Sequence, residues 1–195
     1  MSNLITQSNL ITELEITPSK SKYEIVDIGN WQYNPETEGA YLPRKLLAQL
    51  RGNSPFLQLN FFHEYFGHGS FCEYSNTGKK IVQYEQELSE IEIEILGVNE
   101  LPSDLVFKLD KNNPKFEGYK KLRLELYNFA TIHHNYYEGF AYWLEQELSL
   151  EQNLGELYME KKKIIDPQYI YLVQGLNSFV KQNNKQDLLE KIFFQ

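Results

Sequence analysis

The sequence has few residues of several types, and each scarcity excludes a class of protein. Cys72 is the single cysteine, so no intrachain disulfide can form, and a reducing compartment is expected. Acidic residues outnumber basic ones by 27 to 19, which leaves a formal net charge of −8. Binding to nucleic acid needs a concentrated positive surface and is therefore disfavoured. The longest basic run, Lys161–Lys163, is typical of a solvated helix end.

Long apolar runs are also missing. Residues 1–6 do not have the basic segment and apolar stretch of a signal peptide, and no later segment reads as a membrane span. We therefore expect a cytoplasmic protein that binds no membrane. The 195 residues can bury a core, and no repeat or low-complexity linker divides them. We expect a mobile N-terminus over residues 1–10 and a single domain over residues 11–195.

The hydrophobic pattern predicts an α+β fold that is predominantly helical, with a small N-terminal sheet. Residues 11–17 and 23–28 alternate apolar and polar side chains, which indicates short strands. The polar residues 29–39 are predicted to form a loop. Pro43 fits the first turn of a helix that continues to about Arg51.

Most of the remaining chain has helical patterns. The longest periodic segment covers residues 115–148, and a short amphipathic helix is predicted to continue through Phe194. Residues 76–112 fit both a strand and a helix pattern, so both assignments stay open. Sequence signals that start helices occur at Ser54-Pro55, Asn113-Pro114 and Asp166-Pro167.

The four histidines fall into two short stretches beside acidic residues, which indicates a metal site. His63 and His68 flank Glu64 in a segment that reads as helix. His133 lies five residues before Glu138, about 140° away around a helix, so we interpret it as a packing residue. His134 lies one turn before Glu138 on the same face. It could bind the metal or hold one of its ligands in place.

The spacing of the first histidine pair predicts a local distortion of its helix. Zinc-binding histidines on a helix are usually four residues apart, whereas His63 and His68 are five apart. In a regular helix these side chains would diverge by about 140°. A bulge with i→i+5 hydrogen bonds would bring them together, and Gly67 would make such a bulge easier.

His63-Glu64-Tyr65-Phe66-Gly67-His68 resembles the HExxGH motif of the dipeptidyl peptidase III family, which belongs to the zincin metallopeptidases. Glu138-Gly139-Phe140-Ala141 is similar to the Glu-x-x-Ala core of that family's second motif. The resemblance implies a zincin-like core that binds one Zn²⁺ per chain. It also implies that His63, His68 and Glu138 are the ligands and that Glu64 is the general base.

The chain also departs from that family. The family's proteins are several times longer, with a second lobe, and they have a catalytic histidine downstream of the second motif. Here no histidine follows Glu138, and Tyr137 and Tyr142 occupy positions where the family has acids. We therefore expect a short, distant relative, and dipeptide release is not inferred.

The predicted function is that of a zinc-dependent metallopeptidase acting on a peptide or small protein. Three protein ligands leave a position for water, from which Glu64 would take a proton. With no spare histidine, a tyrosine is expected to stabilise the oxyanion, and Tyr169 and Tyr171, near a helix start, are the first candidates, with Tyr158 a weaker one. His134 and Glu145 are expected to support the ligands.

Two alternatives remain open at this stage. One is a carboxylate bundle that holds one or two irons with Glu64, His68, His134 and Glu138, although such sites usually need repeated Glu-x-x-His pairs. The other is a non-enzymatic metal-binding or interaction protein with a decayed site. Metal content helps to separate these readings, because one zinc per chain supports the hydrolase, two irons the bundle and no metal the interaction protein.

Overall fold

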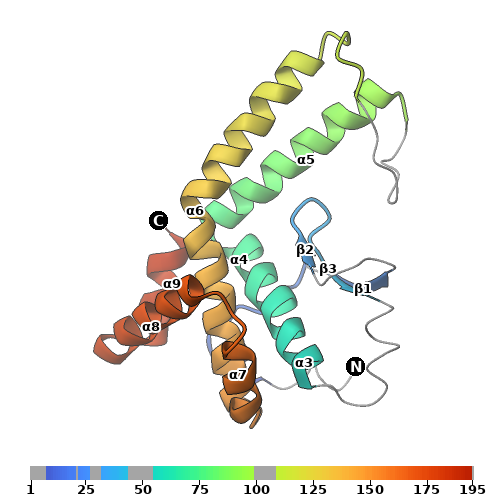
Figure 1. Ribbon diagram of the computed structural model, residues 1–195. Helices are drawn as coiled ribbons and strands as arrows, with labels where there is room; N and C mark the ends of the chain where they lie inside the picture. The colour runs from blue at the N-terminus through green and yellow to red at the C-terminus, as the bar shows by residue number, and fades with distance from the viewer. Residues whose placement is uncertain (1–7, 21, 27–31, 44–54, 99–108, 195) are drawn as a thin grey trace.

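The computed structural model describes residues 8–20, 22–26, 32–43, 55–98 and 109–194 and is mostly helical, as predicted (Figure 1). The helical segments are α1 (Asn9–Glu13), α3 (Pro55–Phe61), the π-helix η1 (Phe62–His68), α4 (Gly69–Tyr74), α5 (Asn76–Leu96), α6 (Phe116–Glu151), α7 (Gly155–Lys162), α8 (Pro167–Gln182) and α9 (Lys185–Phe193).

The predicted small sheet is present near the N-terminus. Strand β3 (Gly39–Pro43) lies between β1 (Lys22–Val26) and β2 (Gln32–Asn34). It pairs in parallel with β1 and antiparallel with β2, and Ala40 faces Tyr33 across the second pair. The strand predicted for residues 23–28 is confirmed as far as Val26, beyond which the chain lies outside the described residues.

Two predictions in this region are wrong. The segment 29–39, predicted as a loop, contains β2 and a tight turn over residues 35–38 that leads into β3. Pro43 ends β3 and does not begin a helix. Its missing N–H is tolerated there because proline is accepted at the edge or end of a strand. The rest of the predicted helix, to Arg51, lies outside the described residues.

The strand predicted for residues 11–17 is also wrong, because residues 11–13 belong to helix α1 and residues 14–17 form a turn and irregular chain. The Ser8 hydroxyl caps this helix by accepting a hydrogen bond from the Ile11 backbone N–H, and it donates one to Glu151. The same carboxylate accepts from the backbone N–H of Leu10, whose side chain is buried. Of the expected mobile segment 1–10, residues 8–10 are thus anchored to α6, and residues 1–7 lie outside the described part.

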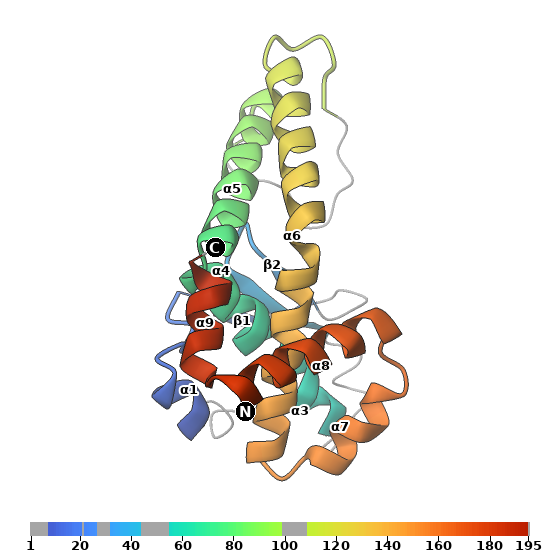
Figure 2. The same cartoon turned by 90° about the vertical axis from the view of Figure 1, so that its left-hand side faces the viewer.

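Helix α6 is the axis of the molecule, and its two halves have different neighbours. Figures 1 and 2 show the C-terminal half surrounded by η1, α7, α8 and α9, while the N-terminal half runs beside α5 as a projecting arm. Phe140, Trp143 and Leu144 are fully buried in the main core. The arm has its own apolar cluster, centred on Leu88 and Leu126. None of the described helices is long and apolar enough to cross a membrane.

Candidate metal centre

The predicted bulge is confirmed, because η1 is a π-helix that covers the whole motif from Phe62 to His68. Its i→i+5 hydrogen bonding brings side chains five residues apart onto one face. The rings of His63 and His68 accordingly lie 4.7 Å apart between centroids and are nearly perpendicular, at 87°. Both side chains are buried. The distortion thus solves the spacing problem that a regular helix would leave.

Helix α6 brings Glu138 to the same point. One oxygen of its carboxylate lies 3.5 Å from Nε2 of His63, and the other lies 3.7 Å from Nε2 of His68. The three residues offer ligand atoms that all lie within 4.8 Å of one another. Zinc ligands at about 2.1 Å in a tetrahedral arrangement are about 3.4 Å apart, so the spacing fits a shared ion.

The charges of the three groups are coupled. Burial lowers the pKa of His63, but hydrogen bonds with Glu138 and Glu145 outweigh it and raise the value to about 9. Burial and the charge of His63 lower the pKa of His68 to about 3. The pKa of Glu138 falls to about 2 because the two histidines outweigh the effect of its burial. In this arrangement His63 holds a proton where a metal cation would sit.

Behind His63, Glu145 and Lys161 extend the polar contacts into the protein. Glu145, expected to support a ligand, is fully buried, and one of its oxygens lies 3.3 Å from Nδ1 of His63. Its other oxygen lies 2.7 Å from Nζ of Lys161, whose side chain is 12% exposed. The interpretation of Lys161–Lys163 as a solvated helix end is therefore wrong for Lys161. It holds for Lys163, which is largely exposed.

Glu64 lies in the same helical turn as the two histidines and is half-buried. Its carboxylate accepts a hydrogen bond from the backbone N–H of Tyr33 in β2. Burial raises its pKa, and the nearby charges of His63 and Glu138 act in opposite directions. The carboxylate is thus held by the sheet within the electrostatic field of His63 and Glu138.

Tyr169 reaches the site from α8, and Tyr171 does not. The Tyr169 hydroxyl is 2.8 Å from Nε2 of His134, and its ring stacks on Tyr142 at 5.2 Å. Tyr142 in turn lies 4.2 Å from the ring of His63. Two residues along the helix, Tyr171 is 76% exposed, because side chains two apart point to different sides.

The remaining candidates lie apart from the ligands. Tyr158 is buried, which raises its pKa, and it is near Glu145. His133 packs on Phe129 at 4.5 Å between ring centroids, in agreement with its interpretation as a packing residue. It is not among the residues whose ligand atoms converge.

Sequence reasoning missed two aromatic walls of the site and one cation. Tyr137 stacks on His68 at 4.0 Å, and Tyr142 covers His63. Both flank the Glu-x-x-Ala core, and Tyr142 lies four residues after Glu138, on the same helix face. This i, i+4 spacing could have placed Tyr142 beside the site from the sequence alone. Lys161 gave no such signal, because only the tertiary fold brings α7 to Glu145.

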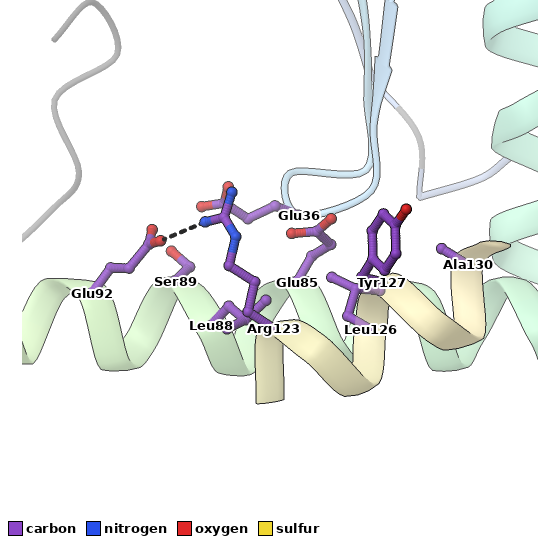
Figure 3. A pocket seen from close by; sticks show the side chains of 9 residues that line it. All are labelled: Glu36, Glu85, Leu88, Ser89, Glu92, Arg123, Leu126, Tyr127 and Ala130. Carbon is purple, nitrogen blue, oxygen red and sulfur yellow. Dashed lines mark ion pairs between the residues drawn. The ribbon is translucent and has the colours of Figure 1, made fainter. Parts of the chain in front are cut away.

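A separate cavity of about 300 Å³ lies between the arm and the β2–β3 turn. Figure 3 shows Glu36 reaching from the turn over the side chains of α5 and α6, and a dashed line joins Arg123 of α6 to Glu92 of α5. The two ion-pair atoms are 3.8 Å apart. None of the residues that line this cavity is His63, His68 or Glu138. The cavity therefore does not extend the candidate site.

Comparison with models of protein families, with curated proteins and with solved structures finds no match to this chain. The resemblance to the dipeptidyl peptidase III family therefore rests on its two short motifs. What the structure adds is a buried group of two histidines and a glutamate that could hold a metal ion.

Proposed function

We propose that this protein is a zinc-dependent metallopeptidase that hydrolyses peptide bonds in a peptide or small protein. One observation carries the proposal. The π-helix η1 places His63 and His68 on one face, opposite Glu138 of α6, and Glu64 belongs to the same turn. A metal site with an adjacent, half-buried carboxylate is the arrangement that metal-assisted hydrolysis requires.

The donor set fits zinc. Two imidazole nitrogens and one carboxylate oxygen are a ligand set of catalytic zinc sites, which keep a fourth position open. A zinc ion bound there would polarise the scissile carbonyl and lower the pKa of a bound water towards about 7. The carboxylate of Glu138 is one-fifth exposed, so the group is accessible from solvent on that side.

The chain's own groups would supply the proton transfers and orientation. Glu64 accepts a proton from the attacking water and passes it to the leaving amine. Tyr169, held by His134, donates a hydrogen bond to the oxyanion of the tetrahedral intermediate. The rings of Tyr137 and Tyr142 cover the two histidines and limit their contact with bulk water. The net charge of −8 favours neutral or basic substrates over acidic ones.

Metal content and one charge-neutral substitution test the proposal. The purified protein is expected to bind one zinc per chain, measured by elemental analysis after removal of loosely bound metal. Glu64→Gln should retain the zinc and lose cleavage of a peptide library. Glu90→Gln, on the exposed face of α5, is the matched control and should cleave as the parent does. Equal cleavage by the Glu64→Gln variant would remove Glu64 from the mechanism.

The iron-bundle alternative is less well supported by the geometry. It requires His134 as a ligand, but His134 contacts the Tyr169 hydroxyl, and the converging group in the described residues contains His63 in its place. Two irons per chain would nevertheless favour that alternative. A parent protein that binds no metal would favour an interaction protein with a decayed site.

A further inference from the structure

We propose that Lys161 is a positioning residue of the metal centre, which acts through Glu145 to fix the imidazole of His63. This inference rests on the proposed metal site and extends it to a residue from a third helix. Lys161 lies near the end of α7, whereas Glu145 lies on α6 and His63 on η1. The structure thus joins three elements in one line of polar contacts.

The contacts in this line are short and protected from solvent. Nζ of Lys161 is 2.7 Å from Oε1 of Glu145, and Oε2 of the same carboxylate is 3.3 Å from Nδ1 of His63. The side chain of Glu145 is fully buried, and those of Lys161 and His63 are 12% and 8% exposed. Each carboxylate oxygen therefore has its own close neighbour, the ammonium group for one and the imidazole ring for the other.

The carboxylate determines which ring nitrogen of His63 is free for a metal. A neutral imidazole has one N–H donor and one acceptor nitrogen. In a neutral ring, the neighbouring Glu145 carboxylate favours the proton on Nδ1, which leaves Nε2, on the side of Glu138, available to a metal. Partners of this kind fix the orientation of a metal-binding histidine and increase its basicity, and their loss typically weakens metal binding by about 10–100-fold.

Lys161 is needed because the carboxylate of Glu145 is fully buried and cannot be stabilised by bulk water. Without a cation beside it, one oxygen of the buried carboxylate loses its charged partner, and the side chain tends to move towards another one. Here the other partner is His63 itself, and this movement disturbs the ring that must face the metal. Lys163, two residues later, pairs with Glu160 on the protein surface and is 67% exposed. It therefore offers a control of the same residue type.

The experiment measures zinc affinity by competition with a chelator, at one pH, for four variants beside the parent. Lys161→Met removes the charge but keeps the apolar stem, and Glu145→Gln removes the charge of the carboxylate. The double variant combines both, and Lys163→Met is the control. We expect both single variants to bind zinc about 10–100-fold more weakly than the parent. The double variant should bind as weakly as Glu145→Gln alone, and the control as tightly as the parent.

The comparison of the double variant with Glu145→Gln decides the inference. If Lys161→Met binds zinc more weakly than the parent, equal affinities here mean that Lys161 acts through Glu145, because its removal has no effect once the carboxylate is gone. Multiplied losses, or a Lys161→Met variant with the parent's affinity, would overturn it. If Lys161→Met does not fold, as judged by thermal unfolding, the double variant still gives this comparison without a lone buried charge. A parent that binds no zinc would contradict the proposed function instead.

Discussion

Gly67 of η1 lies so close to α6 that a Cβ atom at this position would be 2.7 Å from both Cα and Cβ of Ala141. Gly67 immediately precedes His68, and Ala141 lies three residues after Glu138. The contact therefore sets the distance between the two ligand-bearing elements. The sequence alone indicated that Gly67 eases the bulge, whereas the structure shows a steric reason for glycine. The backbone of Gly67 does not itself require glycine, because in the described part of the chain the glycine with a positive φ is Gly97.

Replacing Gly67 by alanine should therefore disturb both stability and metal binding. The added methyl group must push η1 away from α6, and overpacking of this kind typically costs about 1–3 kcal/mol. The same shift separates His68 from Glu138, so zinc affinity should fall as well. Urea unfolding of the metal-free protein measures the first effect, and chelator competition measures the second.

Gly175→Ala is the matched control. Gly175 lies inside α8, and nothing is within 4 Å of a Cβ atom built there. Alanine in a helix interior is more favourable than glycine by about 0.5–1 kcal/mol, so this variant should be at least as stable as the parent. If Gly67→Ala were as stable as Gly175→Ala, the close approach of η1 and α6 would not be what requires glycine.

The sequence predicted the elements that local signals define. Asp166-Pro167 marks the start of α8, where the Asp166 side chain accepts a hydrogen bond from the backbone N–H of Gln168. The periodic segment 115–148 became α6, which extends from Phe116 to Glu151. The spacing of His63 and His68 predicted the π-helix, because two ligands for one ion must share a face.

Predictions failed where contacts distant in sequence decide the structure. Residues 11–17 alternate as a strand would, but Glu151, about 140 residues later, holds the start of α1. The local pattern left residues 76–112 open between strand and helix, and Ile91, Ile93 and Ile95, which alternate, lie in helix α5. Ile91 and Ile95, one helical turn apart, pack into the cluster shared with α6. Lys161 belongs to the same class, because its partner Glu145 is on another helix.

Zinc should stabilise the folded protein, by an amount that grows with the logarithm of its concentration relative to its Kd. A ligand that binds only the folded state adds about 2.7 kcal/mol at a concentration 100 times its Kd. The unfolding temperature of the parent should therefore rise with added zinc, as measured by calorimetry. His68→Ala removes a ligand and should abolish this rise. His133→Ala replaces a histidine outside the converging group, so this variant should still show the rise in unfolding temperature.

Zinc affinity should increase with pH. The pKa of His63 is about 9 in the metal-free protein because its hydrogen bonds with Glu138 and Glu145 outweigh its burial. Below pH 9 zinc must therefore displace one proton, and affinity should rise about tenfold per pH unit from pH 6.5 to 9 and then level off. His68 and Glu138, with pKa values near 3 and 2, have already lost their protons in this range.

The stability of the metal-free protein should change in the opposite direction. A folded-state pKa above the ordinary 6.5 gives stability that is fully present below pH 6.5 and is lost as the pH rises through 9. Urea unfolding across this range, with a chelator present, measures that loss. A zinc affinity that is flat between pH 6.5 and 9 would show that His63 is already neutral without the metal.

Tyr169→Phe should slow peptide cleavage while zinc stays bound. The hydroxyl of Tyr169 contacts His134 and its ring stacks on Tyr142, so the phenyl ring of the variant can keep the packing and lose only the donor. Loss of one hydrogen-bond donor to an oxyanion typically lowers kcat by about 10²–10³-fold. Steady-state kinetics on a cleaved peptide would show this loss in kcat, with little change in KM.

Tyr171→Phe separates this role from a general effect of removing a tyrosine hydroxyl from α8. Tyr171 is 76% exposed and lies two residues from Tyr169 on the same helix, so its variant should cleave at the parent's rate. If Tyr171→Phe were the slower variant, α8 would have to rotate when substrate binds, since two neighbouring side chains on different faces cannot both reach the metal. If neither variant were slower, the oxyanion would be stabilised by the metal or by another donor, and His134 would serve only to hold α8 against α6.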